Sequence, residues 1–377
     1  MGDKIFFPNS AQFDEMNKHL ARIASAVGSH VDISTWGGIQ KAVRAGIAPD
    51  VLPIGTVLST THDHYGTIYW NVVAHDYFKS VHNENAHTMT LLCQSSLGNI
   101  QFDEREAFYY AEDTLPAGTY NFTLDTTYSN WTAGTYQFTL TKPVPKGGVL
   151  VIWGYSTTPL SQLPILSYEA NDITSITETT SITLGKGGVS LGTFGVELNH
   201  TQRVSTGSNN YKESAIRQFL NSAANSMYWW IPLTKFDRPP NNRSPFGFAH
   251  GFDNEFLSCV GTVTVPCAAN SRYESPDSTV TAGEKYTVAD RFYLASQAEL
   301  GGIKDDVAPD DSLVFPYFKD ATNADRIKYK DGAVTSWWTR SANRWSPNIS
   351  HAITSVGVAD HATVSFEIGL VPACTIV

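Results

Sequence analysis

The chain has 377 residues, of which 16% are charged, and its formal net charge at pH 7 is −10. Binding to a nucleic-acid backbone requires a basic surface, so this charge argues against a nucleic-acid partner. No apolar run approaches the roughly 20 residues of a membrane span, so no membrane insertion is expected. The modest charge content and the many aromatic and hydroxyl side chains favour a β-rich architecture.

Residues 1–50 are predicted to form a short helical segment for attachment or oligomerisation. One helix is predicted at residues 9–28. Its apolar residues are spaced three, four, three and four positions apart: Phe13, Met16, Leu20, Ile23 and Val27. This heptad seam is typical of self-association, but a helix packed on its own domain would also fit two heptads. The start of the chain shows no signal-peptide core.

A second helix is predicted to begin near Thr35 and to end at Gly46, with an apolar side formed by Trp36, Ile39 and Val43. The segment 51–96 then opens the main domain, with strands predicted at 56–60, 67–75 and 87–93.

His62 and His64 lie in a turn-like stretch that raises the question of a metal site. Alternate residues of an extended chain share one side, so this pair provides two ligands at most. Structural zinc sites use four ligands and catalytic ones three, which must converge in space. We therefore expect solvated loop histidines and no metal or other cofactor.

Residues 97–190 are predicted to form an inserted all-β, sandwich-like domain. A short repeat supports this prediction, because residues 117–124 and 133–140 share the pattern Ala-Gly-Thr-Tyr-x-Phe-Thr-Leu. Each copy alternates apolar and polar side chains, so the two are expected to be neighbouring strands. Further strands are predicted at 147–153 and 173–184.

The main domain is expected to resume in the segment 191–377. A helix is predicted at 211–223 with Ile216, Phe219 and Leu220 buried, followed by a loop rich in proline and asparagine. The four cysteines are too few and scattered for a disulfide framework: Cys93, Cys259, Cys267 and Cys374. Buried free thiols are expected, although Cys259 and Cys267 could bridge across a hairpin.

The last forty residues have the character of a displayed segment, with apolar ends around a polar middle. Trp337, Trp338 and the alternating Val364, Phe366 and Ile368 are predicted to be buried, the latter three in one strand. Pro372 predicts that the final strand lies at a sheet edge or bends there. Arg340 is interpreted as a core arginine.

The polar middle is predicted to be exposed and to bind a ligand around Trp345, because an amphipathic ring among small polar groups is typical of binding surfaces. The predicted ligand-binding residues are Asn343, Arg344, Trp345, Asn348, Ser350, His351, Asp360, His361, Thr363 and Ser365. The alternative is that Trp345 folds back onto the protein.

The motifs of this segment resemble those of a known group. Trp337-Trp338-x-Arg340-Ser341, the ending Gly369-x-x-Pro372-Ala373 and the upstream stretch Asp290-Arg291-Phe292-Tyr293-Leu294 are similar to C-type-lectin-like proteins of phages and prophages of gut bacteria. That group includes the variable proteins of diversity-generating retroelements, which resemble phage tropism determinants. The resemblance covers about half of the chain. It implies a C-type-lectin-like fold, a trimeric habit and recognition of a host surface molecule.

An enzyme is not expected. Formylglycine-generating enzymes share the lectin-like fold, but they require a paired redox cysteine site, and Cys93 and Cys374 lie in apolar runs. Phosphate-binding loop and metalloprotease motifs do not occur. Calcium-dependent sugar binding is in doubt as well, because neither Glu-Pro-Asn nor Gln-Pro-Asp occurs in the chain.

The sequence thus predicts an α+β protein of a phage virion, made in the host cytoplasm. Its expected partners are a host cell-surface protein or glycan, other virion proteins and further copies of itself in a homotrimer. A structural capsid or tail component that binds no receptor is the alternative, and a bacterial surface adhesin is a third reading.

Overall fold

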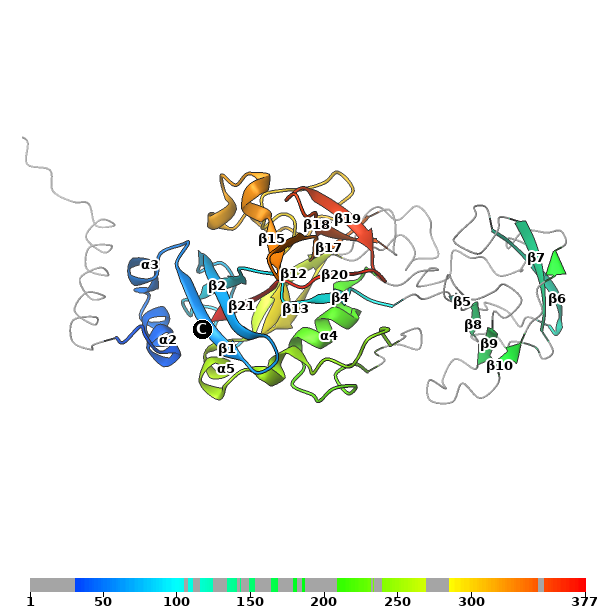
Figure 1. Ribbon diagram of the computed structural model, residues 1–377, viewed down its shortest axis with the longest axis horizontal. Helices are drawn as coiled ribbons and strands as arrows, with labels where there is room; N and C mark the ends of the chain where they lie inside the picture. The colour runs from blue at the N-terminus through cyan, green and yellow to red at the C-terminus, as the bar shows by residue number, and fades with distance from the viewer. Residues whose placement is uncertain are drawn as a thin grey trace, which may run out of the picture.

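The computed structural model describes residues 31–104, 209–231, 239–268, 285–344 and 349–377, together with residue 233 and short segments between 108 and 186. In these ranges short helices surround mostly antiparallel sheets (Figure 1). The predicted α+β class is therefore confirmed. The helix predicted at 9–28 lies outside the described residues.

One five-stranded sheet joins early strands to the last one. Its order is β1 (Val57–His62), β2 (Gly66–His75), β3 (Met89–Cys93), β21 (Pro372–Ile376) and β14 (Phe292–Leu294), all antiparallel. The three strands predicted in 51–96 are confirmed. Because β21 lies between β3 and β14, the prediction of an edge strand at Pro372 is wrong. Pro372 is the first residue of β21, a position that tolerates a missing N–H.

A second five-stranded sheet carries the C-terminal polar segment. Its order is β19 (Ala359–Thr363), β18 (Ile349–Ile353), β17 (Trp337–Ala342), β20 (Glu367–Gly369) and β4 (Asn99–Gln101). β17 and β20 are parallel, and the other neighbours are antiparallel. β19 is an edge strand, so one of its sides remains unpaired within this sheet. Two hairpins accompany the sheets, β12 (Val263–Ala268) with β13 (Lys285–Asp290) and β15 (Lys328–Lys330) with β16 (Ala333–Thr335).

The helices are short and begin at polar caps. The Thr35 hydroxyl accepts a hydrogen bond from the Gly38 N–H (3.1 Å) at the start of α2 (Trp36–Arg44), and Ser214 caps α4 (Ala215–Asn221) in the same way. Gly46 follows α2 with φ +68°, a conformation that favours glycine. Both predicted helices are confirmed with their buried sides. The remaining helical segments are α3 (Ala48–Val51), α5 (Asn254–Cys259), η4 (Tyr211–Glu213), η5 (Phe248–Gly251), η6 (Pro316–Phe318) and η7 (Asn323–Arg326).

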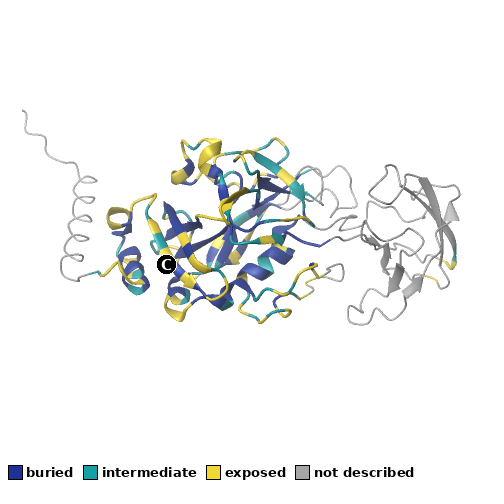
Figure 2. Ribbon diagram, in the orientation of Figure 1, coloured by how far each residue is buried: buried dark blue, intermediate teal, exposed yellow. Residues whose placement is uncertain are grey.

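Buried aromatic side chains fill the interior. Figure 2 shows in dark blue where the buried residues lie along the ribbon. Phe252 stacks on Phe292 with ring centroids 5.2 Å apart. Trp337 and Trp338 are fully buried, as predicted, and their indole N–H groups donate to the carbonyls of Arg326 (3.1 Å) and Ile100 (2.8 Å). The four cysteines are buried free thiols, so the possible bridge between Cys259 and Cys267 is not formed.

Arg340 is the core arginine that the sequence predicts. Its guanidinium makes two hydrogen bonds to the buried carboxylate of Glu299, at 2.5 and 2.6 Å. It also donates to the carbonyls of Leu294 (2.7 Å) and Pro266 (2.9 Å) and to the Ser312 hydroxyl (3.0 Å). One side chain of β17 therefore joins the strand to three other stretches of the chain, around residues 266, 294–299 and 312.

The predicted strand through Val364, Phe366 and Ile368 is wrong. The chain turns between β19 and β20, with the Phe366 N–H donating to the Thr363 carbonyl at 2.9 Å. The Val364 carbonyl accepts hydrogen bonds from the N–H groups of Phe102 and Asp103, which holds Val364 inward. Phe366 is 51% exposed instead of buried.

Strands of the predicted insertion pair with one another. The described sheets there are β10 (Thr179–Ser181), β9 (Pro164–Tyr168), β8 (Val149–Ile152) and β5 (Phe108–Tyr110), and β11 (Gly185–Lys186), β7 (Gly134–Leu140) and β6 (Gly118–Leu124). The two repeat copies are neighbouring strands, β6 and β7, as predicted. At the start of the predicted insertion, β4 pairs with β20, and Phe102 is buried in the main core.

Candidate functional site

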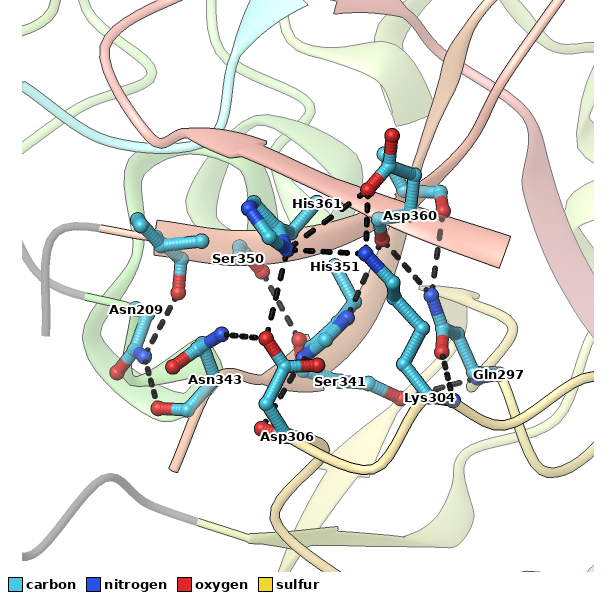
Figure 3. A network of polar contacts seen from close by, with 12 residues as sticks. Asn209, Gln297, Lys304, Asp306, Ser341, Asn343, Ser350, His351, Asp360 and His361 are labelled. Atoms are coloured by element: carbon cyan, nitrogen blue, oxygen red, sulfur yellow. Dashed lines mark hydrogen bonds and ion pairs between the residues drawn. The ribbon is translucent and has the colours of Figure 1, made fainter. Parts of the chain in front are cut away.

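The candidate site is the outer part of the β17–β18–β19 sheet and the chain around it. Its residues come from segments far apart in sequence, and Figure 3 shows how their polar groups converge. Of the ten predicted binding residues, Trp345 and Asn348 lie outside the described residues. The other eight fall into a buried set and a set that reaches solvent.

Three predicted binding residues are buried, which corrects the expectation that they are displayed. Asn343 is 2% exposed, and Ser350 and His351 are 0% exposed. The Ser350 hydroxyl donates to the Ser341 carbonyl at 3.1 Å. Polar side chains can be buried at low cost when such partners satisfy them, so polar composition alone did not indicate the surface here.

Five predicted binding residues reach solvent. His361 is exposed, and Arg344, Asp360, Thr363 and Ser365 are partly exposed. We call these five residues the binding face. Asp360, His361 and Thr363 belong to the edge strand β19, where side chains are available to a partner.

Asp306 joins the buried set to the binding face. Its Oδ2 accepts a hydrogen bond from Asn343 Nδ2 at 2.7 Å and lies 3.4 Å from His361 Nδ1. The Asp306 carbonyl accepts from the Arg344 N–H at 2.8 Å and faces His351 Nε2 at 3.3 Å. Asp306 therefore contacts Asn343 and Arg344, which follow β17. It also faces His351 on β18 and His361 on β19 (Figure 3).

A salt bridge borders the binding face. Lys304 Nζ lies 2.6 Å from Asp360 Oδ1 and 3.5 Å from His361 Nδ1. Partial burial acts to raise the pKa of Asp360, but the hydrogen bonds from Lys304 and the His361 backbone, together with the charge of Lys304, outweigh it and the pKa is lowered. The carboxylate is therefore ionised at neutral pH, and the ammonium of Lys304 balances its charge.

Two amide side chains, those of Asn209 and Gln297, donate hydrogen bonds to backbone carbonyls of this sheet and its loop. Asn209 Nδ2 donates to the carbonyls of Asn343 (2.9 Å) and Ile349 (2.8 Å), which brackets the loop between β17 and β18. Gln297 Nε2 donates to the carbonyls of Ala352 (3.2 Å) and Asp360 (2.9 Å). Nothing in the local spacing of Asn209, Gln297, Lys304 and Asp306 marks them as site residues, so the sequence did not predict them.

Of the two histidines near residue 62, His64 is exposed in a turn, as expected, whereas His62 is buried at the end of β1. His62 is 1% exposed, and its Nε2 lies 2.9 Å from the Phe248 carbonyl. Burial lowers the pKa of His62. Within the described ranges no group of three or more His, Cys, Asp or Glu side chains is arranged to hold a metal ion.

A polar groove lies away from this site, beside α2. Its volume is about 650 Å³, and its walls include Arg44, His82, His87 and Val377. The carbonyl of Val377 accepts hydrogen bonds from Gln40 Nε2 (2.8 Å) and Arg44 Nε (3.2 Å), so these contacts join the last strand to α2.

These observations define a mixed α+β protein in which a buried polar network supports an exposed sheet edge. A family model described as a domain of unknown function (DUF6273) matches residues 179–377, more than half of the chain, and the chain belongs to this family. No curated protein and no solved structure matches the chain. In the part of the chain that the structure describes, no helix is long and apolar enough to cross a membrane.

Proposed function

We propose that the protein is a receptor-binding protein of a phage virion, with a C-type-lectin-like scaffold that presents the binding face to a host surface molecule. The observation that carries this proposal is the contrast within one short segment. Trp337, Trp338 and Arg340 are fixed in the core, whereas His361 and its neighbours on β19 reach solvent at a sheet edge. Binding residues supported by a rigid scaffold are typical of recognition proteins.

The buried polar set has a supporting role in this proposal. The side chains of Asn343, Ser350 and His351 do not face a ligand. They lie within hydrogen-bonding distance of Asp306, Ser341 and Asp360, in that order. Recognition would then depend on Trp345 and on the exposed side chains of β19. The resemblance to lectin-like phage proteins in the motifs around Trp337 and Pro372 adds the fold and the host partner to the proposal.

The test is a triple variant, Trp345→Ala, His361→Ala and Thr363→Ala, in the full chain. A buried aromatic anchor at an interface contributes about 2 kcal/mol or more, so adsorption to host cells should fall by at least about thirtyfold. The melting temperature should change little, because none of the three is a described core residue. Tyr69→Ala is the matched control, since Tyr69 is 51% exposed on β2 and outside the binding face.

Unchanged adsorption of the triple variant would overturn this assignment of the binding face. If the parent protein adsorbs to no cells while it assembles into particles, the structural virion component becomes the better proposal. Display of the parent on intact bacteria without phage genes would favour a surface adhesin.

A further inference from the structure

Two histidines from distant parts of the chain face each other at the surface. His64 lies in the turn after β1, and His250 lies in η5, 186 residues further along the chain. His64 Nε2 lies 3.5 Å from His250 Nδ1, and the two rings are stacked with their centroids 5.6 Å apart. His64 is exposed and His250 is partly exposed, so both rings are accessible to a solute.

Hydrogen bonds beside the two histidines fix the segments that carry them. The Asp63 N–H donates to the Gly251 carbonyl at 2.8 Å, so each partner is the chain neighbour of one of the two histidines. The buried His62 Nε2 lies 2.9 Å from the Phe248 carbonyl, and His62 Nδ1 accepts from the His64 N–H at 3.1 Å. The turn after β1 is therefore joined to η5 next to both rings.

Phe246 packs against both imidazole rings. Its ring stacks on that of His64 with centroids 4.4 Å apart and an angle of 13° between the planes. The same ring lies 4.8 Å from the ring of His250. Packing restricts the rotation of both histidine side chains, so less conformational entropy is lost when their nitrogens bind one ligand.

The separation of the two facing nitrogens suits one zinc ion. Zinc–imidazole bonds are about 2.0–2.1 Å long, so two ligands of a tetrahedral ion place their nitrogens about 3.3–3.4 Å apart. Two ligands at a right angle would be closer, about 2.9 Å apart at the same bond length. The 3.5 Å between His64 Nε2 and His250 Nδ1 matches the tetrahedral value, and it is at the long limit of a hydrogen bond.

We propose that His64 and His250 bind one Zn²⁺ ion, through Nε2 and Nδ1 respectively. Zinc prefers imidazole ligands, whereas Mg²⁺ and Ca²⁺ prefer oxygen. Both ring nitrogens of His62 are engaged within the fold, so His62 is not a third ligand. Water completes the tetrahedron at the two remaining positions. The site lies outside the binding face, and this inference goes beyond the proposed function and does not depend on it.

Titration calorimetry of the tag-free full chain with zinc chloride tests this site, with magnesium chloride as the comparison. His64→Ala and His250→Ala should each weaken zinc binding at this site by at least about tenfold, because each removes one of two ligands. Since one ion needs both rings, the double variant should lose no more binding than either single variant. Zinc bound by other histidines of the chain would remain in all three variants. Magnesium should not bind there.

His82→Ala is the matched control, because His82 is exposed in another loop and its loss should leave zinc binding unchanged. A thermal melt of each variant without zinc checks that it is folded. In the parent chain, NMR of the ring nitrogens should place the metal on Nε2 of His64 and on Nδ1 of His250. Zinc affinity that is the same in the parent and both single variants would overturn the proposal. Additive losses in the double variant would overturn it as well, because they indicate two separate sites with one histidine each.

Discussion

At the scale of single residues, the buried ion pair of Arg340 and Glu299 holds β17 in the core. Both side chains are 0% exposed, and each is satisfied by the other and by its surroundings. Burial raises the pKa of Glu299, but two hydrogen bonds from Arg340 favour the charged form. Removing one partner would leave a buried charge without compensation, which is far costlier than losing an exposed pair.

We predict that Glu299→Gln destabilises the protein by about 3–5 kcal/mol in urea denaturation. The exposed pair of Lys285 and Asp311 provides the control, because its side chains are 48% and 69% exposed. Lys285→Ala should cost less than about 1 kcal/mol. Similar losses for both variants would show that the pair beneath the sheet has no special role.

At the scale of elements, the turn between β19 and β20 decides which side chains of the C-terminal segment are buried. Val364 is 0% exposed and Phe366 is 51% exposed, although both fit the same alternating pattern. The difference arises from the contacts of the Val364 carbonyl with the backbone of residues 102 and 103.

Val364→Ala should therefore destabilise the protein by about 2 kcal/mol, mainly through lost apolar burial. Phe366→Ser removes a larger side chain but should change the free energy of unfolding by no more than about 0.5 kcal/mol. Thermal and chemical denaturation of the two variants would check this order. The opposite order would restore the continuous strand that the sequence suggests.

Local patterns predicted the elements better than the site. The start of α2 near Thr35, the buried side of α4 and the strand β2 are encoded within a few residues, and each prediction is confirmed. The burial of Asn343 and His351 depends instead on Asp306, which lies 37 and 45 residues away in sequence. Such distant partners have no signature in local spacing, so a polar segment was taken for an exposed one.

At the scale of the whole molecule, the residues matched by the family model are only part of those that form the two main sheets. The matched residues 179–377 contain β20 and β21, but these strands pair with β4 and β3 from the preceding part of the chain. Contacts across the whole length therefore complete both sheets. α2 is part of this body too, because Trp36 packs against Phe256 with ring centroids 4.7 Å apart.

The oligomeric state remains a prediction at this scale. The heptad seam from Phe13 to Val27 predicts a homotrimer, and light scattering of the full chain should give three times the mass of one chain, 41.3 kDa. A version that begins at Asp32 keeps α2 and its contact with α5, and it should be monomeric. A monomeric full-length protein at micromolar concentration would contradict this prediction.

The central claim is that the buried polar residues of this sheet stabilise the fold, whereas the exposed ones are proposed to bind the receptor. One pair of residues tests this claim most directly. His351 and His361 lie opposite each other on β18 and β19, yet the first is buried and the second exposed. The measurement is adsorption to host cells per folded molecule at neutral pH, with a thermal melt of each variant. We predict that His361→Ala loses adsorption with a nearly unchanged melting temperature, whereas His351→Ala melts earlier but still adsorbs. Equal adsorption of both variants, or the reverse assignment, would contradict the account.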